Sequence, residues 1–211
     1  MTASGRAGGA SGPSGPADGV RRAGRPDVEA MVEAMAHAFY DDPVFGWLFP
    51  NDDRRLAQSR KYFAGRTRIL MRQGEVYTVD GGVAAAMWAR PGEWRDPFRD
   101  VLRQFASLVP ALGRRVPRSL AGLREIEERH PAAPHWYLAV LGTRPERQGE
   151  GLGSALLQPV LAECDRLEIP AYLETGRERN VHFYSRHGFA VTEEIRMPKG
   201  PPMWLMWRDP R

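Results

Sequence analysis

The stretch Arg147-Gln148-Gly149-Glu150-Gly151-Leu152-Gly153-Ser154 decides the fold of this chain. It follows an apolar run at residues 136–141 and opens an apolar helical pattern at residues 152–161. The first N–H groups of a helix have no partner inside the helix, and the helix dipole adds partial positive charge at that end. Glycines let an anion approach the backbone because no Cβ stands in the way. The order of strand, glycine-rich turn and helix therefore predicts a site for a phosphate-bearing cofactor.

Three phosphate-binding motifs can be compared with this stretch. A P-loop requires Lys followed by Ser or Thr after its last glycine, and neither pair follows these glycines. A dinucleotide-binding fingerprint requires the spacing G-x-G-x-x-G, whereas Gly149, Gly151 and Gly153 alternate strictly. The third spacing, Q-x-x-G-x-G, is filled by Gln148, Gly151 and Gly153. Its alternative is an ordinary glycine-rich turn that caps a helix.

A second motif occupies residues 180–189, where Asn180 precedes Phe183-Tyr184 and Gly188-Phe189. Together the two motifs resemble the signatures of the GNAT superfamily of N-acetyltransferases, which bind acetyl-coenzyme A (acetyl-CoA). In that family the Asn helps to hold the cofactor, and the Tyr lies beside its sulfur. The resemblance therefore implies acetyl-CoA as the cofactor of this chain.

Within the superfamily, residues 135 to about 207 are similar to puromycin N-acetyltransferase-like proteins. Weaker similarity reaches back to residues 83–88 with Pro91, and the N-terminal third matches poorly. That third is where acceptor specificity usually lies in this fold. Glu150 departs from the pattern, since relatives commonly carry Lys or Arg there. We expect only its backbone N–H to face the cofactor, with its side chain turned to water.

The composition fits one globular domain, because 211 residues include 42% hydrophobic side chains. The formal net charge of +4 is too small and too interleaved to argue for nucleic-acid binding. The single cysteine, Cys164, cannot form an intramolecular disulfide, which favours a cytoplasmic setting, and its helical pattern places it in or near the core. His130 and His135 flank prolines without a Cys partner, so no metal site is expected.

Residues 1–18 are rich in Gly, Ser, Ala and Pro. We expect a disordered tail here, because so few apolar side chains cannot offset the entropy of ordering. This segment lacks the apolar region of a secretory signal, and no apolar run in the chain is long enough for a membrane span. Residues 19–211 are expected to form a single N-acetyltransferase domain that is a monomer or a homodimer.

Hydrophobic periodicity predicts an α/β domain. The predicted helices span residues 28–40, 54–73, 151–167 and 180–187, and two or three short helices interrupted by Pro110 and Pro117 are expected between 97 and 129. Asp41-Asp42-Pro43 is expected to end the first helix. The predicted strands span residues 20–23, 75–79, 83–89, 135–141, 171–174, 189–194 and 202–208. The resemblance implies the GNAT fold, a mixed, mostly antiparallel sheet of about seven strands splayed between the fourth and fifth strands.

Acetyl transfer to an amine needs a neutral amine, a polarised thioester carbonyl and a proton for the departing thiolate. By resemblance, Tyr184 is the general acid that protonates the coenzyme A sulfur; the alternative is an aromatic ring that packs its helix on the sheet. A backbone N–H near residues 140–142 is implied to polarise the carbonyl. The expected cofactor-binding residues are Val140, Leu141, Gly142, Arg147, Gln148, Gly149, Glu150, Gly151, Leu152, Gly153, Ser154, Asn180 and Tyr184.

Glu174 is the first candidate for the general base, because it ends a predicted inner strand beside the splay. Its alternative is a structural carboxylate that accepts hydrogen bonds from loop amides. His135 is the second candidate, at the far end of the fourth strand. Asp41 and Asp42 are the third, since they could bind a cationic amine or take its proton through water. They could instead only form the turn that ends the first helix.

The expected substrate-binding residues are Asp41, Asp42, Phe45 and Trp47. Carboxylates beside aromatic rings suit an amine on an aromatic scaffold, such as an aminonucleoside. The sequence thus predicts an acyltransferase that moves an acetyl group directly to the primary amine of a small molecule, in antibiotic or toxic-metabolite detoxification. Two alternatives stay open. One is acetylation of a protein or peptide amine, and the other is a non-catalytic acyl-CoA-binding regulatory module.

Overall fold

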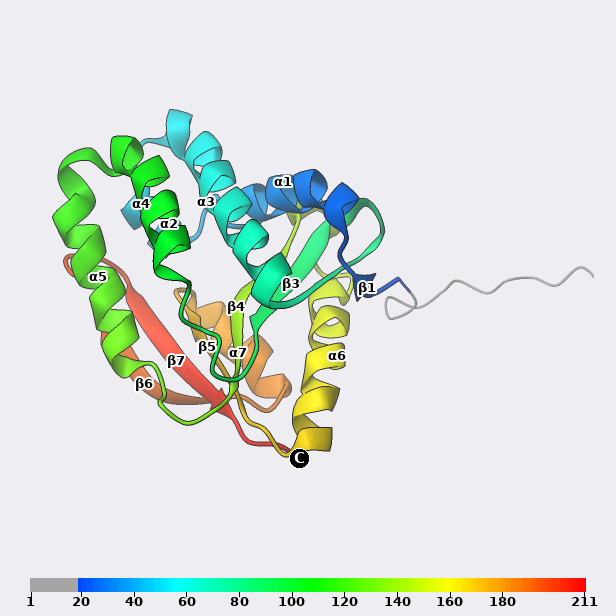
Figure 1. The fold of residues 1–211 in the computed structure, drawn as a ribbon. Helices are drawn as coiled ribbons and strands as arrows, with labels where there is room; N and C mark the ends of the chain where they lie inside the picture. Colours follow the sequence, from blue (N-terminus) through cyan, green and yellow to red (C-terminus); the bar gives the residue numbers. More distant parts are fainter. Residues whose placement is uncertain (1–18) are drawn as a thin grey trace, which may run out of the picture.

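The computed structural model describes residues 19–211, so the tail predicted at residues 1–18 lies outside the described residues. One seven-stranded sheet runs through the molecule in the order β1-β2-β3-β4-β5-β7-β6 (Figure 1). The strands are β1 (Arg21–Arg22), β2 (Gly74–Thr78), β3 (Ala84–Ala89), β4 (Trp136–Thr143), β5 (Ala171–Thr175), β6 (Ala190–Arg196) and β7 (Pro202–Arg208). All neighbouring strands are antiparallel except the parallel pair β4–β5. The predicted mixed, mostly antiparallel α/β sheet is confirmed.

Helices cover both faces of this sheet (Figure 1). They are α1 (Val28–Ala38), α2 (Pro43–Leu48), α3 (Asp52–Gln73), α4 (Phe98–Leu112), α5 (Val116–Arg129), α6 (Leu152–Leu167) and α7 (Glu178–Arg186). One buried cluster joins α6 and α7 to one face of the sheet, and it includes Cys164, as predicted. Two further clusters join α1 to α5 to the opposite face. In the described part of the chain, no helix is long and apolar enough to cross a membrane.

The sheet opens between β4 and β5. These strands pair only at Trp136↔Ala171, Tyr137↔Tyr172 and Leu138↔Leu173. Beyond those residues β4 continues against β3, and β5 continues against β7. A bulge shifts the β3–β4 register between Met87 and Trp88 and bends β4 at this point. The strands therefore diverge toward their C-terminal ends, as the predicted splay requires.

Two helices, α4 and α5, lie between residues 97 and 129 as predicted, but the prolines act differently from the prediction in two respects. Asp42-Pro43 does more than end the first helix, because it also starts α2: the Asp42 carboxylate accepts from the N–H groups of Val44 at 2.9 Å and Phe45 at 3.3 Å, and Pro43 occupies the first helical position. Neither predicted interruption by proline occurs. Pro110 lies in the last turn of α4, where one hydrogen bond is lost, and Pro117 lies in the first turn of α5, where no partner is needed.

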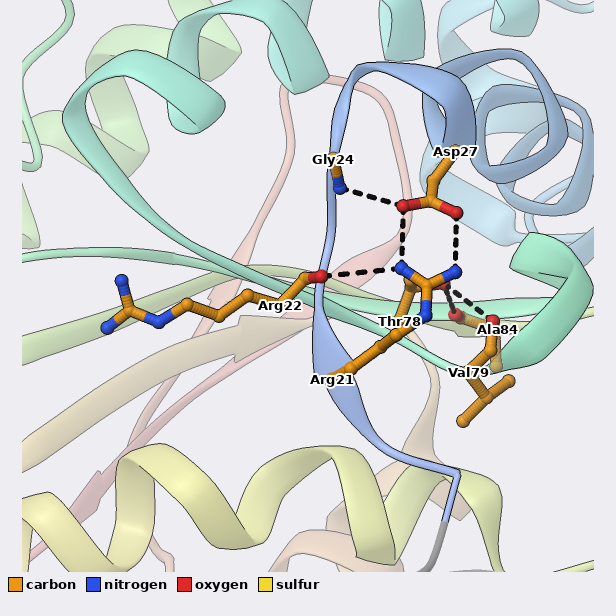
Figure 2. Close-up of polar contacts among 7 residues, drawn as sticks. All are labelled: Arg21, Arg22, Gly24, Asp27, Thr78, Val79 and Ala84. Atoms are coloured by element: carbon orange, nitrogen blue, oxygen red, sulfur yellow. Dashed lines mark hydrogen bonds and ion pairs between the residues drawn. The ribbon is translucent and has the colours of Figure 1, made fainter.

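The edge strand β1 is held in place by the side chain of Asp27. Its carboxylate accepts from the two terminal nitrogens of Arg21 at 2.8 and 2.7 Å and from the N–H of Gly24 at 2.7 Å (Figure 2). On the neighbouring strand β2, Thr78 Oγ1 donates to the carbonyl of Ala84 at 2.8 Å (Figure 2). These bonds tie the start of α1 to the sheet edge and fix the turn between β2 and β3.

Candidate active site

A cavity of about 430 Å³ opens where β4 and β5 separate. Its walls come from the end of α1, the end of β4, the loop before α6, and one side of α7. The lining residues are Ala38, Phe39, Asp42, Leu141, Gly142, Thr143, Arg147, Gln148, Gly149, Gly151, Leu152, Gly153, Ser154, Arg177, Arg179, Asn180, Phe183, Tyr184 and Arg186. The two motifs singled out in the sequence therefore meet at one cavity.

The glycine-rich loop presents its backbone to this cavity. Gly149 has φ 87° and Gly151 has φ 80°, in the left-handed region that favours glycine. Gly151 precedes the first turn of α6, and no side chain caps that helix. The N–H groups of Leu152 and the two residues after it are therefore available to a ligand in the cavity. An anion would be bound here by these donors and by the positive end of the helix dipole.

Three side chains shape the loop. Gln148 Nε2 donates to the carbonyl of Thr143 at 3.0 Å and ties the loop to the end of β4. Arg147 and Glu150 form an ion pair, with Arg147 Nη2 2.7 Å from Glu150 Oε2. Glu150 is exposed and does not line the cavity, so its carboxylate turns toward Arg147 and away from the site. Arg147 lines the cavity with part of its charge already balanced.

The cavity gathers most of the predicted cofactor-binding residues. All of them line it except Val140 and Glu150. Asn180 is held in place because its Nδ2 donates to Thr175 Oγ1, at the end of β5, over 3.2 Å. Ser154 Oγ lies 3.0 Å from His187 Nε2, so the two predicted motifs also touch through side chains.

The prediction missed three cavity-lining cations, Arg177, Arg179 and Arg186. They flank the Asn180 motif in the sequence, since Arg177 and Arg179 come shortly before Asn180 and Arg186 comes two residues after Tyr184. Arg186 also stacks over Phe183, with 5.8 Å from its guanidinium carbon to the ring centre. Together with the α6 N-terminus, these cations make one wall of the cavity suited to phosphate groups.

Tyr184 faces the cavity from α7 and is otherwise buried. Phe183 and Phe189 pack against its ring, with centroid distances of 5.2 and 5.9 Å. Burial raises the pKa of the Tyr184 phenol, and the charge of Asp42 raises it further. Tyr184 therefore keeps its proton at neutral pH and can donate it.

Asp42 faces the same cavity from the opposite side, at the N-terminus of α2. Burial raises the pKa of its carboxyl, against the hydrogen bonds from Phe45 and Val44 and the charge of Arg177. Arg177 Nε lies 3.5 Å from Asp42 Oδ2. Asp42 and Tyr184 therefore line the same cavity, and the Asp42 carboxyl already lies beside the guanidinium of Arg177.

Glu174 lies outside the cavity lining, on the face of β5 that carries Tyr172, whose cluster includes Ile126 of α5. Its carboxylate is buried, and Oε1 lies 3.6 Å from His130 Nδ1. The charge of Glu174 contributes to raising the pKa of Tyr137 and of Tyr172, after the larger effect of burial. His135 also belongs to this cluster, 3.0 Å from His130. Among residues 19–211, no three His, Cys, Asp or Glu side chains form a group that could hold a metal ion.

Three of the predicted substrate-binding residues lie outside the cavity lining. Asp41 is exposed and lines a second, open depression next to Arg177. Phe45 is buried and stacks on Phe63 at 5.1 Å. Trp47 packs toward the β6–β7 connection, where its Nε1 donates to the carbonyl of Pro198 at 3.2 Å. Of the predicted acceptor residues, the structure brings only Asp42 to the cavity.

Comparisons with known proteins agree with this arrangement. A model of the acetyltransferase (GNAT) family matches residues 81–189, just over half of the chain. An uncharacterized N-acetyltransferase of Schizosaccharomyces pombe is 23% identical over 206 residues, which cover 87% of this chain and 80% of that protein.

Two solved structures show the same fold. A crystal structure described as histone acetyltransferase HPA2 and related acetyltransferase, from Corynebacterium glutamicum, has a TM-score of 0.70 and 28% identity, with coverage of 92% of this chain and 96% of that one. Arylalkylamine N-acetyltransferase 2 from Aedes aegypti has a TM-score of 0.55 and 10% identity, with coverage of 91% and 98%. The second likeness concerns the fold alone.

Proposed function

The chain belongs to the acetyltransferase (GNAT) family and is an acyltransferase, and we propose on that premise that it moves an acetyl group from acetyl-CoA directly to the primary amine of a small molecule. One observation carries this proposal. The open α6 N-terminus, Tyr184 and Asp42 line a single cavity, so a donor and an acceptor could meet there.

The donor side fits the phosphates of acetyl-CoA. The unpartnered N–H groups at the start of α6 would hold the pyrophosphate, and Arg177, Arg179 and Arg186 would balance its charge. Backbone N–H groups of β4 beyond Leu138 face the opening because β5 no longer pairs with them. They would polarise the thioester carbonyl as negative charge develops on its oxygen.

Tyr184 would act as the general acid. Its phenol stays protonated because burial raises its pKa, and it lines the cavity that the thioester would enter. When the carbon–sulfur bond breaks, Tyr184 would donate its proton to the sulfur.

The acceptor side combines two carboxylates with separate tasks. Asp42 would attract the cationic amine, because it lines the cavity opposite Tyr184. Glu174, at the point where β5 leaves β4, would accept the amine proton so that the nitrogen can attack the carbonyl. Phe39, which lines the cavity, would provide an apolar surface for the body of the amine.

An aromatic amine such as an aminonucleoside fits this side best, in keeping with the resemblance of residues 135 to about 207 to puromycin N-acetyltransferase-like proteins. The biological role would be detoxification of an antibiotic or toxic metabolite in the cytoplasm. Acetylation of a protein amine is less well supported, because Asp42 and Glu174 are buried rather than spread along an open groove.

Thiol release from acetyl-CoA, measured against a panel of amines, tests the proposal. The panel should contain puromycin, other aminonucleosides, aliphatic amines and peptides with free N-termini, with the products identified by mass spectrometry. N-acetylated small amines are the expected product. Acetylated peptides alone would move the acceptor to proteins. Acetyl-CoA binding without thiol release from any mixture would contradict catalysis and indicate a regulatory module.

A further inference from the structure

A buried chain of hydrogen-bonding groups leads away from Glu174. His130 Nδ1 lies 3.6 Å from Glu174 Oε1, and His130 Nε2 lies 3.0 Å from His135 Nε2. His135 Nδ1 lies 2.7 Å from the backbone oxygen of Ala133. The side chains of His130 and Glu174 are only 2% and 6% exposed, and Glu174 Oε1 is buried without a hydrogen-bond partner at normal distance. Such a row of buried polar groups needs a defined placement of its protons.

The backbone oxygen of Ala133 determines which ring nitrogens of His135 and His130 carry hydrogen. A carbonyl only accepts, so His135 must carry its hydrogen on Nδ1. Burial lowers the pKa of His135, which is therefore neutral at pH 7 and has a lone pair on Nε2. That lone pair can only accept, so His130 must donate from its own Nε2. The remaining nitrogen, His130 Nδ1, is left facing the Glu174 carboxylate.

One proton must lie between His130 Nδ1 and Glu174. Without it, a nitrogen lone pair would face a carboxylate inside the protein, which is strongly unfavourable. With the proton on Nδ1, His130 becomes a donor and a counter-charge to the carboxylate, which stays free to accept a second proton from a substrate.

The neighbouring groups hold His130 in this orientation. The indole of Trp94 stacks on its ring, with 3.7 Å between centroids and an angle of 22°. Tyr137 from β4 and Tyr172 from β5 meet the same ring edge to face, at 4.9 and 4.8 Å.

The other titratable groups around this cluster come from three further elements. Arg66 and Tyr62 face it from α3, and Arg66 is paired with Asp96, in the segment between β3 and α4. Glu193 acts on Tyr172 from β6. Arg66 thus shares its charge with Asp96, and His130 remains the basic side chain with a nitrogen aimed at Glu174.

The position of Glu174 on β5 is consistent with a role as the base, because it lies where β5 separates from β4. It follows Leu173, the last β5 residue paired with β4, so it marks the point where the two strands part. Its other neighbour, Thr175, bonds Asn180, which lines the cavity. Because side chains alternate along a strand, the Glu174 carboxylate shares the face of β5 that carries Tyr172, opposite the face that carries Leu173 and Thr175.

We propose that His130 is a positioning residue for Glu174, with His135 fixing the ring so that His130 directs a proton-bearing Nδ1 at the carboxylate. This inference rests on the proposed function with Glu174 as the base. In the transfer, the cationic amine first loses one proton to Glu174, which releases it to solvent. The nitrogen then attacks the thioester carbonyl, and its second proton passes to Glu174 as the carbon–sulfur bond breaks and Tyr184 donates a proton to the departing sulfur. Both groups then regain their starting state by exchange with solvent, and the histidines keep their protons throughout.

A double-mutant cycle tests the proposal. Glu174→Gln should lower kcat by about 100-fold, the usual contribution of a general base. His130→Phe, which keeps a ring for Trp94 to stack on, should lower kcat by about 10-fold without changing acetyl-CoA binding. The double variant should be no slower than Glu174→Gln alone, because both changes remove one function. His130→Asn, whose amide nitrogen replaces Nδ1 as a donor, should recover part of the loss. His37→Phe, in the last turn of α1 and not among the cavity-lining residues, is the matched control.

The pH profile separates positioning from a packing defect. In His130→Phe the acidic limb of kcat/KM should move to higher pH, because the carboxylate loses its neighbouring counter-charge. A fall in kcat with an unmoved limb, or additive losses in the double variant, would overturn the role of His130 while leaving acetyl transfer intact. Full activity of Glu174→Gln would overturn the base assignment and this inference together.

A measurement on the unaltered protein covers the case in which His130→Phe fails to fold. The chain has five histidines, so ring ¹⁵N spectra of the labelled protein can be assigned. We expect hydrogen on Nδ1 alone for His135 and on both nitrogens for His130. A bare Nδ1 on His130 would overturn the proposal.

Discussion

The two sides of the opening between β4 and β5 are built in different ways. The proposed donor side is mainly backbone: the end of β4, a glycine-rich loop and the uncapped start of α6, all within residues 141–154, with arginine side chains added by residues 177–186. The proposed acceptor side would consist of side chains from distant segments, with Asp42 at the start of α2, Glu174 on β5 and His130 after α5. The donor side lines an open cavity, whereas most of the acceptor side is buried.

This difference predicts how substitutions on each side should affect substrate binding and the reaction rate. A backbone site depends on conformation, so one side chain in the wrong place can block it completely. A site made of side chains depends on charge and proton position, so single substitutions should lower the rate or weaken acceptor binding while donor binding persists. Substitutions on the donor side should therefore weaken acetyl-CoA binding, whereas substitutions on the acceptor side should lower the rate or weaken amine binding.

The largest effect is expected from Gly151→Glu. This glycine has φ 80°, which strains any other residue, and the new carboxylate would stand where the pyrophosphate is proposed to bind. The dissociation constant for acetyl-CoA, measured by calorimetry, should rise by roughly 100-fold or more. Gly92→Glu is the matched control, because Gly92 has φ 82° with open space around it and lies outside the cavity. Equal affinities for acetyl-CoA in the two variants would remove the loop from the binding site.

Tyr184→Phe comes next and should act on the rate alone. Without the phenol the departing thiolate has no positioned acid, so kcat should fall by about 100-fold, while acetyl-CoA affinity stays within a factor of two to three. Single-turnover and binding measurements separate the two quantities. Tyr77→Phe removes a phenol on β2, outside the cavity lining, and should leave kcat unchanged. An unaffected kcat in Tyr184→Phe would show that another donor protonates the sulfur.

Asp42→Asn should have a smaller effect, confined to the acceptor. Asparagine caps a helix as well as aspartate does, so α2 should stay intact while the charge in the cavity is lost. The KM for a cationic amine should rise by about 10-fold, as expected for losing a charged hydrogen-bond partner. The same change at the exposed neighbour Asp41 should raise this KM less. A larger effect at Asp41 would place the amine in the open depression outside the cavity.

The smallest effect concerns stability at the far edge of the sheet. Arg21 and the N–H of Gly24 lower the pKa of Asp27 to about 2, from an unfolded value near 3.8. A lowered carboxyl pKa stabilises the fold above pH 4, and this contribution is lost as the pH falls toward 2. Asp27→Asn should therefore lower the free energy of unfolding at pH 7 by about 1 kcal/mol or less, because Arg21 is partly exposed.

Urea unfolding at several pH values measures this effect. The difference between the native chain and Asp27→Asn should shrink as the pH falls from 4 to 2. Glu127→Gln, an exposed carboxylate on α5, serves as the control. A difference that is constant with pH would show that the contact acts through packing rather than charge.

The same contrast explains what could be predicted from the sequence. The glycine-rich stretch and the Asn180 motif are local patterns, and local backbone geometry follows from them. The sheet and the splay were therefore predicted, and the residues expected to bind the cofactor meet at one cavity. The acceptor side was harder to predict from the sequence, because no local pattern indicates a contact between His130 and Glu174, which are 44 positions apart. Long-range packing was also missed for Phe45 and Trp47, which were expected at the substrate but lie outside the cavity lining.

The dipeptide Asp42-Pro43 has two structural effects, one on the helix before it and one on the helix after it. Proline disfavours helix in the residue before it, which predicts the end of α1. It also suits the first position of the next helix, which together with the Asp42 cap starts α2. Because of the second effect, Asp42 caps α2 and its carboxyl group lies near Tyr184.

The proposed reaction is direct transfer across the opening, from a donor held by the glycine-rich loop to an amine held by the opposite side. The only cysteine, Cys164, is fully buried with a pKa raised to about 12 by burial, and it does not line the cavity, so it cannot carry the acetyl group. Initial rates of thiol release, with acetyl-CoA and amine both varied, should give intersecting double-reciprocal lines. Parallel lines, with an acetyl group on the protein after incubation with acetyl-CoA alone, would contradict the account.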